Sequence, residues 1–244
     1  MAANTHAADT GRMPRKPRLQ LAGWPQHVVQ RGNDRKPTFR DDADRLLYLR
    51  ALQEMAQRYA CDIHAYVLMS NHVHLLVTPR VGGGLSRCMQ QVGRRYVRHF
   101  NERYERTGTL WEGRFRSCLV GEREYLLNCY RYIEMNPVRA GMVATPAAWR
   151  WSSHRCNALA ETDTRVTPHP DYLELGETPE TRLRAYGCLF SEALQKESTE
   201  QLRHATEKSL VYGDPATLER IETLLGRSLG TGRPGRPRKP EHQP

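Results

Sequence analysis

The order of apolar and polar positions along the chain predicts strands and helices in alternation. Residues that are apolar at every second position predict strands, at 26–31, 61–70, 72–79 and 113–120. Apolar residues at every third or fourth position predict helices that begin near Asp41, Leu85 and Gly121. The third helix should end near Asn136, because Pro137 cannot continue the hydrogen bonding of a helix interior. The order βαββαβα is that of a ferredoxin-like split βαβ sheet, so we expect an α+β fold with the helices on one face.

The same pattern divides the chain into four parts. Residues 1–17 are polar and basic, and residues 230–244 consist largely of proline, glycine and basic residues, so we expect a disordered basic arm and a disordered tail. Residues 18–155 contain the predicted sheet and form the main domain. Residues 156–229 begin with a polar loop and continue as a helical region from about residue 180, with a break at Gly213-Asp214-Pro215.

The composition argues against a membrane protein or a secreted one. Hydrophobic residues make up 39% of the chain, and no apolar run approaches the ~18 residues that a membrane span needs. The first ten residues lack the apolar core of a secretory signal. The six cysteines form no CxxC pair, which argues against a zinc knuckle or a disulfide framework. We therefore expect a cytoplasmic protein without a membrane partner.

The distribution of charge points to a class of ligand. The net charge is +10, but residues 11–40, 85–120 and 226–240 carry +7, +5 and +5, so the rest of the chain is net negative. Separate basic blocks are typical of proteins that bind nucleic acid, since lysine and arginine release condensed counterions from the phosphate backbone. The alternative is a basic enzyme with one acidic small ligand. The pattern favours nucleic acid, and with it a location at the nucleoid.

Two histidines on the third predicted strand suggest a metal site. His72 and His74 flank Val73, so strand alternation places both imidazoles on one face of the sheet and Val73 on the other. At that separation one ion can bind both rings. Histidines at this spacing are also common as core or surface residues, so the pair alone does not establish a metal site.

The third predicted helix supplies two further candidates. Tyr132 and Asn136 are four residues apart and share one helix face, whereas Tyr130 faces another side. An amide oxygen from Asn136 would complete a His-His-Asn ligand set with positions open for phosphate oxygens, and the Tyr132 phenol would lie near the metal. The alternative is that both tyrosines are packing residues and that Asn136 is a helix C-cap.

These motifs, in this order, resemble a known family. The segments NHVHLL and YRYIEMNPVRAG, about sixty residues apart, are similar to the single-tyrosine HUH transposases, and most similar to their REP-associated tyrosine transposase branch. The segments HVVQRGNDRKPTFRDD, RTGTLWEGRFRS and GMVATPAAWRWSS support the resemblance, which covers about residues 13–155. The C-terminal run from ATEKSLVYGD to GRPRK resembles the appendage of longer members.

The resemblance implies a site and a reaction. In an HUH catalytic domain at 18–155, His72, His74 and Asn136 would bind Mg²⁺ or Mn²⁺, and Tyr132 would be the nucleophile. Such enzymes bind imperfect hairpins, cleave single-stranded DNA through a 5′-phosphotyrosine linkage that frees a 3′-OH, and rejoin it without ATP. A metal ion fits physically, because a phenol is a weak nucleophile at neutral pH and a cation on the phosphate offsets the developing charge. The expected partners are single-stranded and hairpin DNA, with the protein a monomer or a homodimer.

Basic residues outside this set are candidates for DNA contact. They lie in the N-terminal arm, along the second helix, on the last strand and in the tail: Arg15, Lys16, Arg18, Arg94, Arg95, Arg98, Arg114, Arg116, Arg236 and Arg238. Arg114 and Arg116 alternate on one strand face with Phe115 opposite, while the arginines of the second helix equally fit a solvated face. The tail segment GRPRKP resembles an AT-hook core, which lies in A·T-rich minor grooves, although short Arg-Pro tails are common. Trp111 could stack an unpaired base or be buried, and His64 could pack or contact DNA.

Three functions are compatible with the sequence. The first is a transposase-type DNA strand transferase that acts at hairpin-associated sites. The second is a DNA-binding regulator of repeat elements with little catalysis, and the third is a metal-dependent nuclease without a covalent step. A pure DNA-binding protein has no physical need for two histidines, Tyr132 and Asn136 together, so these four residues favour the first function.

Overall fold

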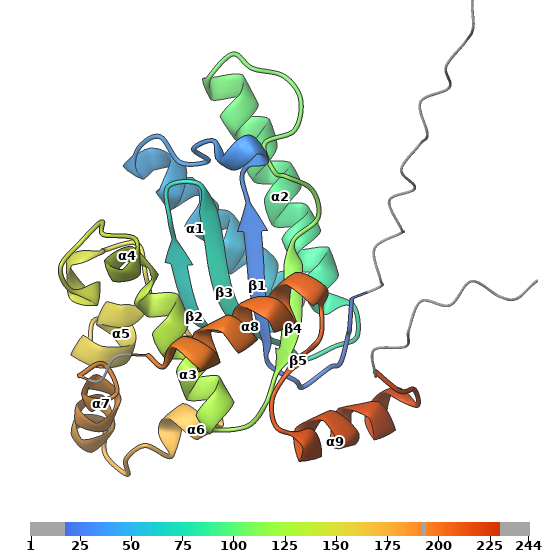
Figure 1. The fold of residues 1–244 in the computed structure, drawn as a ribbon. Helices are drawn as coiled ribbons and strands as arrows, with labels where there is room; N and C mark the ends of the chain where they lie inside the picture. The colour runs from blue at the N-terminus through green and yellow to red at the C-terminus, as the bar shows by residue number, and fades with distance from the viewer. Residues whose placement is uncertain (1–17, 192–193, 230–244) are drawn as a thin grey trace, which may run out of the picture.

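A computed structural model describes residues 18–191 and 194–229 of the chain. A five-stranded sheet forms the centre of this part, and helices cover it (Figure 1). The order across the sheet is β2-β3-β1-β4-β5; the pairs β2–β3, β3–β1 and β1–β4 are antiparallel, and β5 is parallel to β4. The strands are β1 (Gln26–Arg31), β2 (Cys61–Leu68), β3 (His72–Pro79), β4 (Arg116–Val120) and β5 (Val211–Tyr212). The predicted α+β fold class is confirmed, and the first four strands have the predicted split βαβ arrangement.

The helices connect the strands and flank them. Those that the sequence predicts inside the main domain begin and end within a few residues of the expected positions. The α-helices are α1 (Asp42–Arg58), α2 (Gly84–Arg103), α3 (Glu124–Glu134), α4 (Asn136–Arg139), α5 (His154–Leu159), α6 (Pro170–Leu173), α7 (Pro179–Cys188), α8 (Lys196–Lys208) and α9 (Pro215–Leu225). Two short 3-10 turns, η1 (Asn33–Arg35) and η2 (Pro146–Ala148), complete the described elements. Among the described residues, no helix combines the length and the apolar character that crossing a membrane requires.

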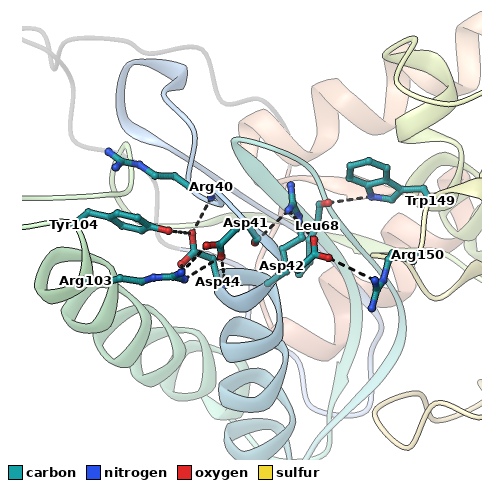
Figure 2. A network of polar contacts seen from close by, with 10 residues as sticks. Arg40, Asp41, Asp42, Asp44, Leu68, Arg103, Tyr104, Trp149 and Arg150 are labelled. Atoms are coloured by element: carbon teal, nitrogen blue, oxygen red, sulfur yellow. Dashed lines mark hydrogen bonds and ion pairs between the residues drawn. The ribbon is translucent and has the colours of Figure 1, made fainter.

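A polar network joins the start of α1 to the end of α2 (Figure 2). Asp41 caps α1 by accepting a hydrogen bond from the Asp44 backbone N–H at 3.0 Å. The buried Asp44 carboxylate accepts from the Arg40 backbone N–H at 2.8 Å and from the Tyr104 hydroxyl at 2.9 Å. Arg103 bridges both aspartates, with its guanidinium 2.9 Å from Asp44 and 2.5 Å from Asp41. Because a buried carboxylate is stable only when it is paired in this way, the network holds α1 and α2 as one layer.

Helices cover both faces of the sheet. Val28, Val73 and Leu75 pack on the face covered by α1 and α2. Leu76 and Cys118 pack on the opposite face, which α3 and α8 cover. The expectation that the helices lie on one face is therefore wrong. The physical reason is that a strand such as β3 is apolar on both sides, with Leu75 on one and Leu76 on the other, so both faces must be shielded from water.

The residues after 155 pack against this sheet. The predicted polar loop contains the short helices α5 and α6, and the predicted helical region consists of α7, α8 and α9. The break predicted at Gly213 is confirmed, since Asp214 caps α9 by accepting from the Thr217 backbone N–H at 2.7 Å. β5 precedes this break and pairs with β4 through Leu119 and Val211. The sequence pattern missed β5 because two residues are too few to display a period, and the division of the chain at residue 155 stays a prediction.

Candidate active site

A cavity of about 330 Å³ lies on the sheet face that α3 and α8 cover. Its lining includes His72, His74, Tyr132 and Asn136, so the structure brings all four predicted site residues together within one chain. The ring centroids of His72 and His74 are 5.0 Å apart, and the Tyr132 ring is 5.6 Å from that of His74. His74 and Tyr132 are only 4% and 5% exposed. The phenol and the His74 imidazole are therefore largely shielded from bulk water.

Local geometry explains how the backbone presents these side chains. On β3, Val73 points into the core beneath α1 and α2, which leaves His72 and His74 on the cavity face. On the other wall, α3 ends at Glu134 and Asn136 begins the single turn α4. The Asn136 amide nitrogen donates to the Tyr132 carbonyl at 2.8 Å. Asn136 therefore does cap the helix end, and this same bond leaves its amide oxygen available to the cavity.

Burial keeps the histidines of the cavity neutral. It lowers the pKa of His72 to about 4, with a smaller contribution from the nearby Arg31. Burial also lowers the pKa of His74 well below its ordinary value, and the neighbouring His27 and His72 act in the same direction. At neutral pH both rings consequently carry a nitrogen lone pair, which is the form that binds a metal ion.

A hydrogen bond to Asn71 selects the tautomer of His72. The Asn71 amide nitrogen donates to the Arg35 carbonyl at 2.8 Å, so its amide oxygen faces the His72 ring. That oxygen lies 2.7 Å from His72 Nδ1 and can only accept. Nδ1 of His72 therefore carries the proton, and the lone pair resides on Nε2. This is the arrangement that outer-shell partners impose on metal-binding histidines.

His74 has a different partner, which the sequence analysis missed. Its Nδ1 lies 2.9 Å from Nε2 of His27 on β1, and Nδ1 of His27 lies 2.8 Å from the Thr206 hydroxyl on α8. His27 is 1% exposed, and burial lowers its pKa to about 3. In the sequence, the only indication was that His27, Val29 and Arg31 alternate along β1 and so share one strand face. This places His27 near His74 only once β1 is known to pair with β3.

Five arginines line the cavity and make it suitable for an anion. Two of them, Arg114 and Arg116, were predicted from the alternation along residues 113–120, although β4 itself begins at Arg116, and Phe115 between them is buried as expected. The others come from β1, α4 and α8 and were missed: Arg31, Arg139 and Arg203. The Arg139 guanidinium lies over the Tyr132 ring, 4.7 Å from its centroid. Two acidic residues, Glu112 and Glu207, also line the cavity.

The other basic candidates that the structure describes do not line this cavity. Arg94, Arg95 and Arg98 are exposed on the side of α2 that faces away from the sheet, where Arg95 pairs with Glu54 and Arg98 with Glu102. Arg18 donates from Nε to the Phe115 carbonyl at 3.1 Å and stacks on the Phe115 ring. The roles predicted for Arg15, Lys16, Arg236 and Arg238 concern positions outside the described residues, as do the predictions of a disordered arm and tail.

Three other aromatic candidates are packing residues. Tyr130 is fully buried, with its ring 6.0 Å from that of Tyr172. Trp111 is 5% exposed and belongs to the core under α1 and α2. His64 lies outside the cavity, where its ring nitrogens contact the Thr167 carbonyl at 2.7 Å and the Thr78 hydroxyl at 2.8 Å.

The donor set suits a divalent cation. Two neutral imidazoles and one amide oxygen are ligands that Mn²⁺ accepts and that leave coordination positions for phosphate oxygens. Within the part of the chain that the structure describes, no group of three or more His, Cys, Asp or Glu side chains could hold a metal ion. A metal ion in this cavity would therefore require the Asn136 oxygen, or an oxygen of the substrate, beside the two histidines.

Comparison with known proteins shows which family part of this chain resembles. The sequence profile described as "Transposase IS200 like" matches residues 23–136, which contain β1 to β4 and α3. The solved structure of a REP-associated tyrosine transposase bound to a REP hairpin is similar, with a TM-score of 0.53 and 17% identity over 65% of this chain and 96% of that one. A crystal structure described as a candidate transposase from Deinococcus radiodurans R1 shares 18% identity over 54% of this chain and 97% of its own, with a TM-score of 0.35 that supports no inference. A comparison with curated proteins returns no significant match.

The profile match and the similar fold agree with the family resemblance that was seen in the sequence motifs. The matched residues include the two histidines, Tyr132 and Asn136, and the structure gathers these into one cavity. The fold is similar to that of the REP-associated tyrosine transposase, and residues 23–136 match the IS200-like transposase family.

Proposed function

We propose that this protein is a transposase that cleaves and rejoins single-stranded DNA beside hairpins, through a covalent bond to Tyr132. The observation that carries the proposal is the packing of the Tyr132 ring against His74 in a cavity lined by five arginines. Neutral histidines and cations around a phenol would favour its reaction with a phosphodiester, which supports this role for Tyr132.

The metal site forms one half of this proposal. We assign His72, His74 and Asn136 as ligands of Mg²⁺ or Mn²⁺, supported by the neutral rings and by the free amide oxygen. A bound cation would neutralise charge on the scissile phosphate and orient it for in-line attack. The arginines on the walls would hold the flanking phosphates, and Arg139, stacked on Tyr132, would stabilise negative charge that develops on the phenolic oxygen.

The covalent step balances without another reactant. The Tyr132 oxygen forms a bond to phosphorus, and the bond between phosphorus and the 3′-oxygen breaks. The phenol proton passes through solvent to the departing oxygen, which gives a 5′-phosphotyrosine and a 3′-hydroxyl. Attack by a 3′-hydroxyl reverses the step and rejoins the strand, so the linkage retains the bond energy and ATP is not needed.

The partner we propose is DNA with a hairpin and a single-stranded flank. The similar solved structure is bound to a REP hairpin, and the basic cavity of this chain has the complementary charge. Because one chain supplies both the histidines and the tyrosine, we propose that a monomer is sufficient for cleavage.

A covalent adduct tests the function. The protein incubated with Mn²⁺ and a labelled hairpin substrate should give a protein–DNA adduct that survives a denaturing gel. Tyr132→Phe should abolish the adduct while hairpin affinity stays within about twofold, because only one hydroxyl is removed. Tyr130→Phe is the matched control on the same helix and should retain the adduct, since Tyr130 is fully buried and does not line the cavity.

The other outcomes separate the alternative functions. An adduct that persists in Tyr132→Phe would place the nucleophile elsewhere. Cleavage without any adduct would indicate a nuclease that uses water. Hairpin binding with neither cleavage nor adduct would indicate a regulator of repeat elements.

A further inference from the structure

Helix α8 reaches the cavity from outside the part of the chain that matches the family. The match ends at residue 136, whereas α8 spans Lys196–Lys208 and packs against β1 and β4 (Figure 1). Three of its residues, Arg203, Thr206 and Glu207, line the cavity. Thr206 is also the residue that contacts His27 behind the histidine pair. The C-terminal region thus supplies the Thr206 side chain, which contacts His27, the hydrogen-bond partner of His74.

The hydrogen atoms of this contact can be placed by following its partners. The Thr206 hydroxyl donates to the Leu202 carbonyl at 2.8 Å, because a carbonyl can only accept. Its single hydrogen is then used, so Thr206 must accept from Nδ1–H of His27 and, at 3.3 Å, from the Cys118 thiol. A hydroxyl oxygen has two lone pairs, and both are thereby filled.

The second bond follows from the first. With its proton on Nδ1 and its ring neutral, His27 presents a lone pair at Nε2, which accepts from Nδ1–H of His74. The two rings are within 9° of coplanar and their centroids are 5.1 Å apart. With a 2.9 Å distance between the two bonded ring nitrogens, the ring centroids can be only slightly farther apart than this. The rings therefore meet edge to edge, and the N–H of His74 points along the lone pair of His27 Nε2.

We infer that Thr206, acting through His27, is a positioning residue that holds His74 with its Nε2 lone pair directed at the metal site. The inference rests on the proposed function, because it concerns the affinity of the proposed site for its metal. The chain runs from the Leu202 carbonyl through Thr206 and His27 to His74, and each bond fixes the direction of the next. His27, Thr206 and His74 are 1%, 3% and 4% exposed, so these hydrogen bonds are largely shielded from bulk water.

A purely structural role for Thr206 makes a different prediction. If the residue only filled space under α8, valine would replace it, since the two side chains have nearly the same shape. If it sets the tautomer of His74, removal of the hydroxyl lets the His27 ring carry its proton on either nitrogen. His74 would then populate both tautomers, and only one of them offers Nε2 to a metal.

The experiment compares Thr206→Val, which lacks the hydroxyl, with Thr206→Ser, which keeps it, in the full chain. Calorimetric titration with Mn²⁺ should show affinity about 10- to 100-fold weaker in Thr206→Val and close to wild type in Thr206→Ser. In the metal-free protein, ¹⁵N NMR of the imidazoles should show His74 protonated at Nδ1 in the wild type and in Thr206→Ser, and a tautomer mixture in Thr206→Val. The His72 signal should not move, because Asn71 selects that tautomer.

Thr199→Val is the matched control, at a buried position two turns earlier on α8. Equal loss of affinity in Thr199→Val, or equal shifts at His72 and His74, would mean a general loosening of α8 and would overturn the inference. Wild-type affinity in Thr206→Val with His74 still protonated at Nδ1 would overturn it too. If the wild type bound no Mn²⁺, the proposed metal site would fail, while the NMR comparison would still decide the tautomer relay.

A second pair of variants applies if Thr206→Val does not fold. His27→Gln offers an amide that can accept from His74 and donate to Thr206, whereas His27→Leu fills the space without either bond. Retention of Mn²⁺ affinity in His27→Gln with loss in His27→Leu supports the relay. Equal affinity in the two variants would refute it.

Discussion

The buried His64 makes the folded state of this protein less stable at acidic pH. His64 is 3% exposed, and both of its ring nitrogens contact oxygen atoms, the Thr167 carbonyl and the Thr78 hydroxyl. Burial lowers the pKa of His64 to about 4, although the hydrogen bond to Thr167 opposes the shift. The ring is therefore neutral in the folded protein under conditions in which the unfolded chain would already bind a proton.

The resulting pH dependence has a definite sign. Because the folded-state pKa lies below that of the unfolded chain, the contribution of His64 is complete above about pH 6.5 and is lost as the pH falls toward about 4. Between pH 7 and pH 5 we expect the free energy of unfolding to fall by about 2 kcal/mol more in the wild type than in His64→Gln. Urea unfolding at the two pH values measures the difference. His204→Gln, at an exposed position on α8, is the control, and an equal fall in all three proteins would contradict the prediction.

At the scale of elements, the helix that carries Tyr132 is anchored by one buried carboxylate. Glu134 is fully buried near the end of α3. It accepts hydrogen bonds from residues of α5, from the residue that caps the N-terminus of α5, and from α7. The donors are the Ser153 hydroxyl at 2.6 Å, the Asn157 amide at 2.8 Å, His154 Nδ1 at 3.0 Å and the Tyr186 hydroxyl at 2.8 Å. Four donors use the full acceptor capacity of a carboxylate, so the C-terminal turn of α3 is held firmly beside Asn136.

Replacing this carboxylate should loosen the helix. Glu134→Gln places an amide NH₂ against groups that donate, and we expect a loss of roughly 1–3 kcal/mol in the free energy of unfolding. Adduct formation should fall as well, because the phenol is positioned by the same turn. Thermal unfolding and the denaturing gel measure the two effects. Glu124→Gln, at the exposed start of α3, should stay within about 0.5 kcal/mol of wild type, and equal losses in both variants would rule out the anchoring role.

At the scale of the whole molecule, the basic residues occupy two sides of the sheet. One group lines the cavity with Arg114 and Arg116, beside the histidines. The other lies along α2, on the far side of the α1 and α2 layer, where Arg95 and Arg98 pair with glutamates. Ion pairing reduces the positive charge that α2 offers to a phosphate, so we expect the cavity side to dominate DNA binding.

Two charge-matched double variants test this distribution. Arg114→Gln/Arg116→Gln should weaken hairpin affinity at least tenfold at moderate salt and should reduce the slope of log affinity against log salt by up to about 2. Arg95→Gln/Arg98→Gln removes the same net charge and should change both quantities less. Fluorescence anisotropy over a salt series measures them. Equal effects would mean that DNA also follows α2, in agreement with the contacts first predicted for Arg94, Arg95 and Arg98.

The sequence by itself determined the features that depend on neighbouring residues. Strand geometry turns alternate residues to opposite faces, so His72 and His74 could be placed together and Val73 in the core. Helix geometry separates Tyr132 from Tyr130: both are buried, but only Tyr132 of the two lines the cavity. These relations hold wherever the segment lies in the fold, because consecutive backbone dihedrals alone set them.

Only the tertiary structure decided which distant segments meet. No local sequence pattern encodes the sheet face on which α3 lies. The same holds for the strand register that sets His27 beside His74, and for the packing of α8 against this part of the sheet. His27 is separated by 47 positions from His74 and by 179 positions from Thr206. Such contacts depend on how segments far apart in the chain bury their apolar surfaces together. The proposed metal ligands and the proposed nucleophile could be found from the motifs, whereas His27 and Thr206, which contact His74 directly and through His27, became visible only once the sheet and α8 were packed.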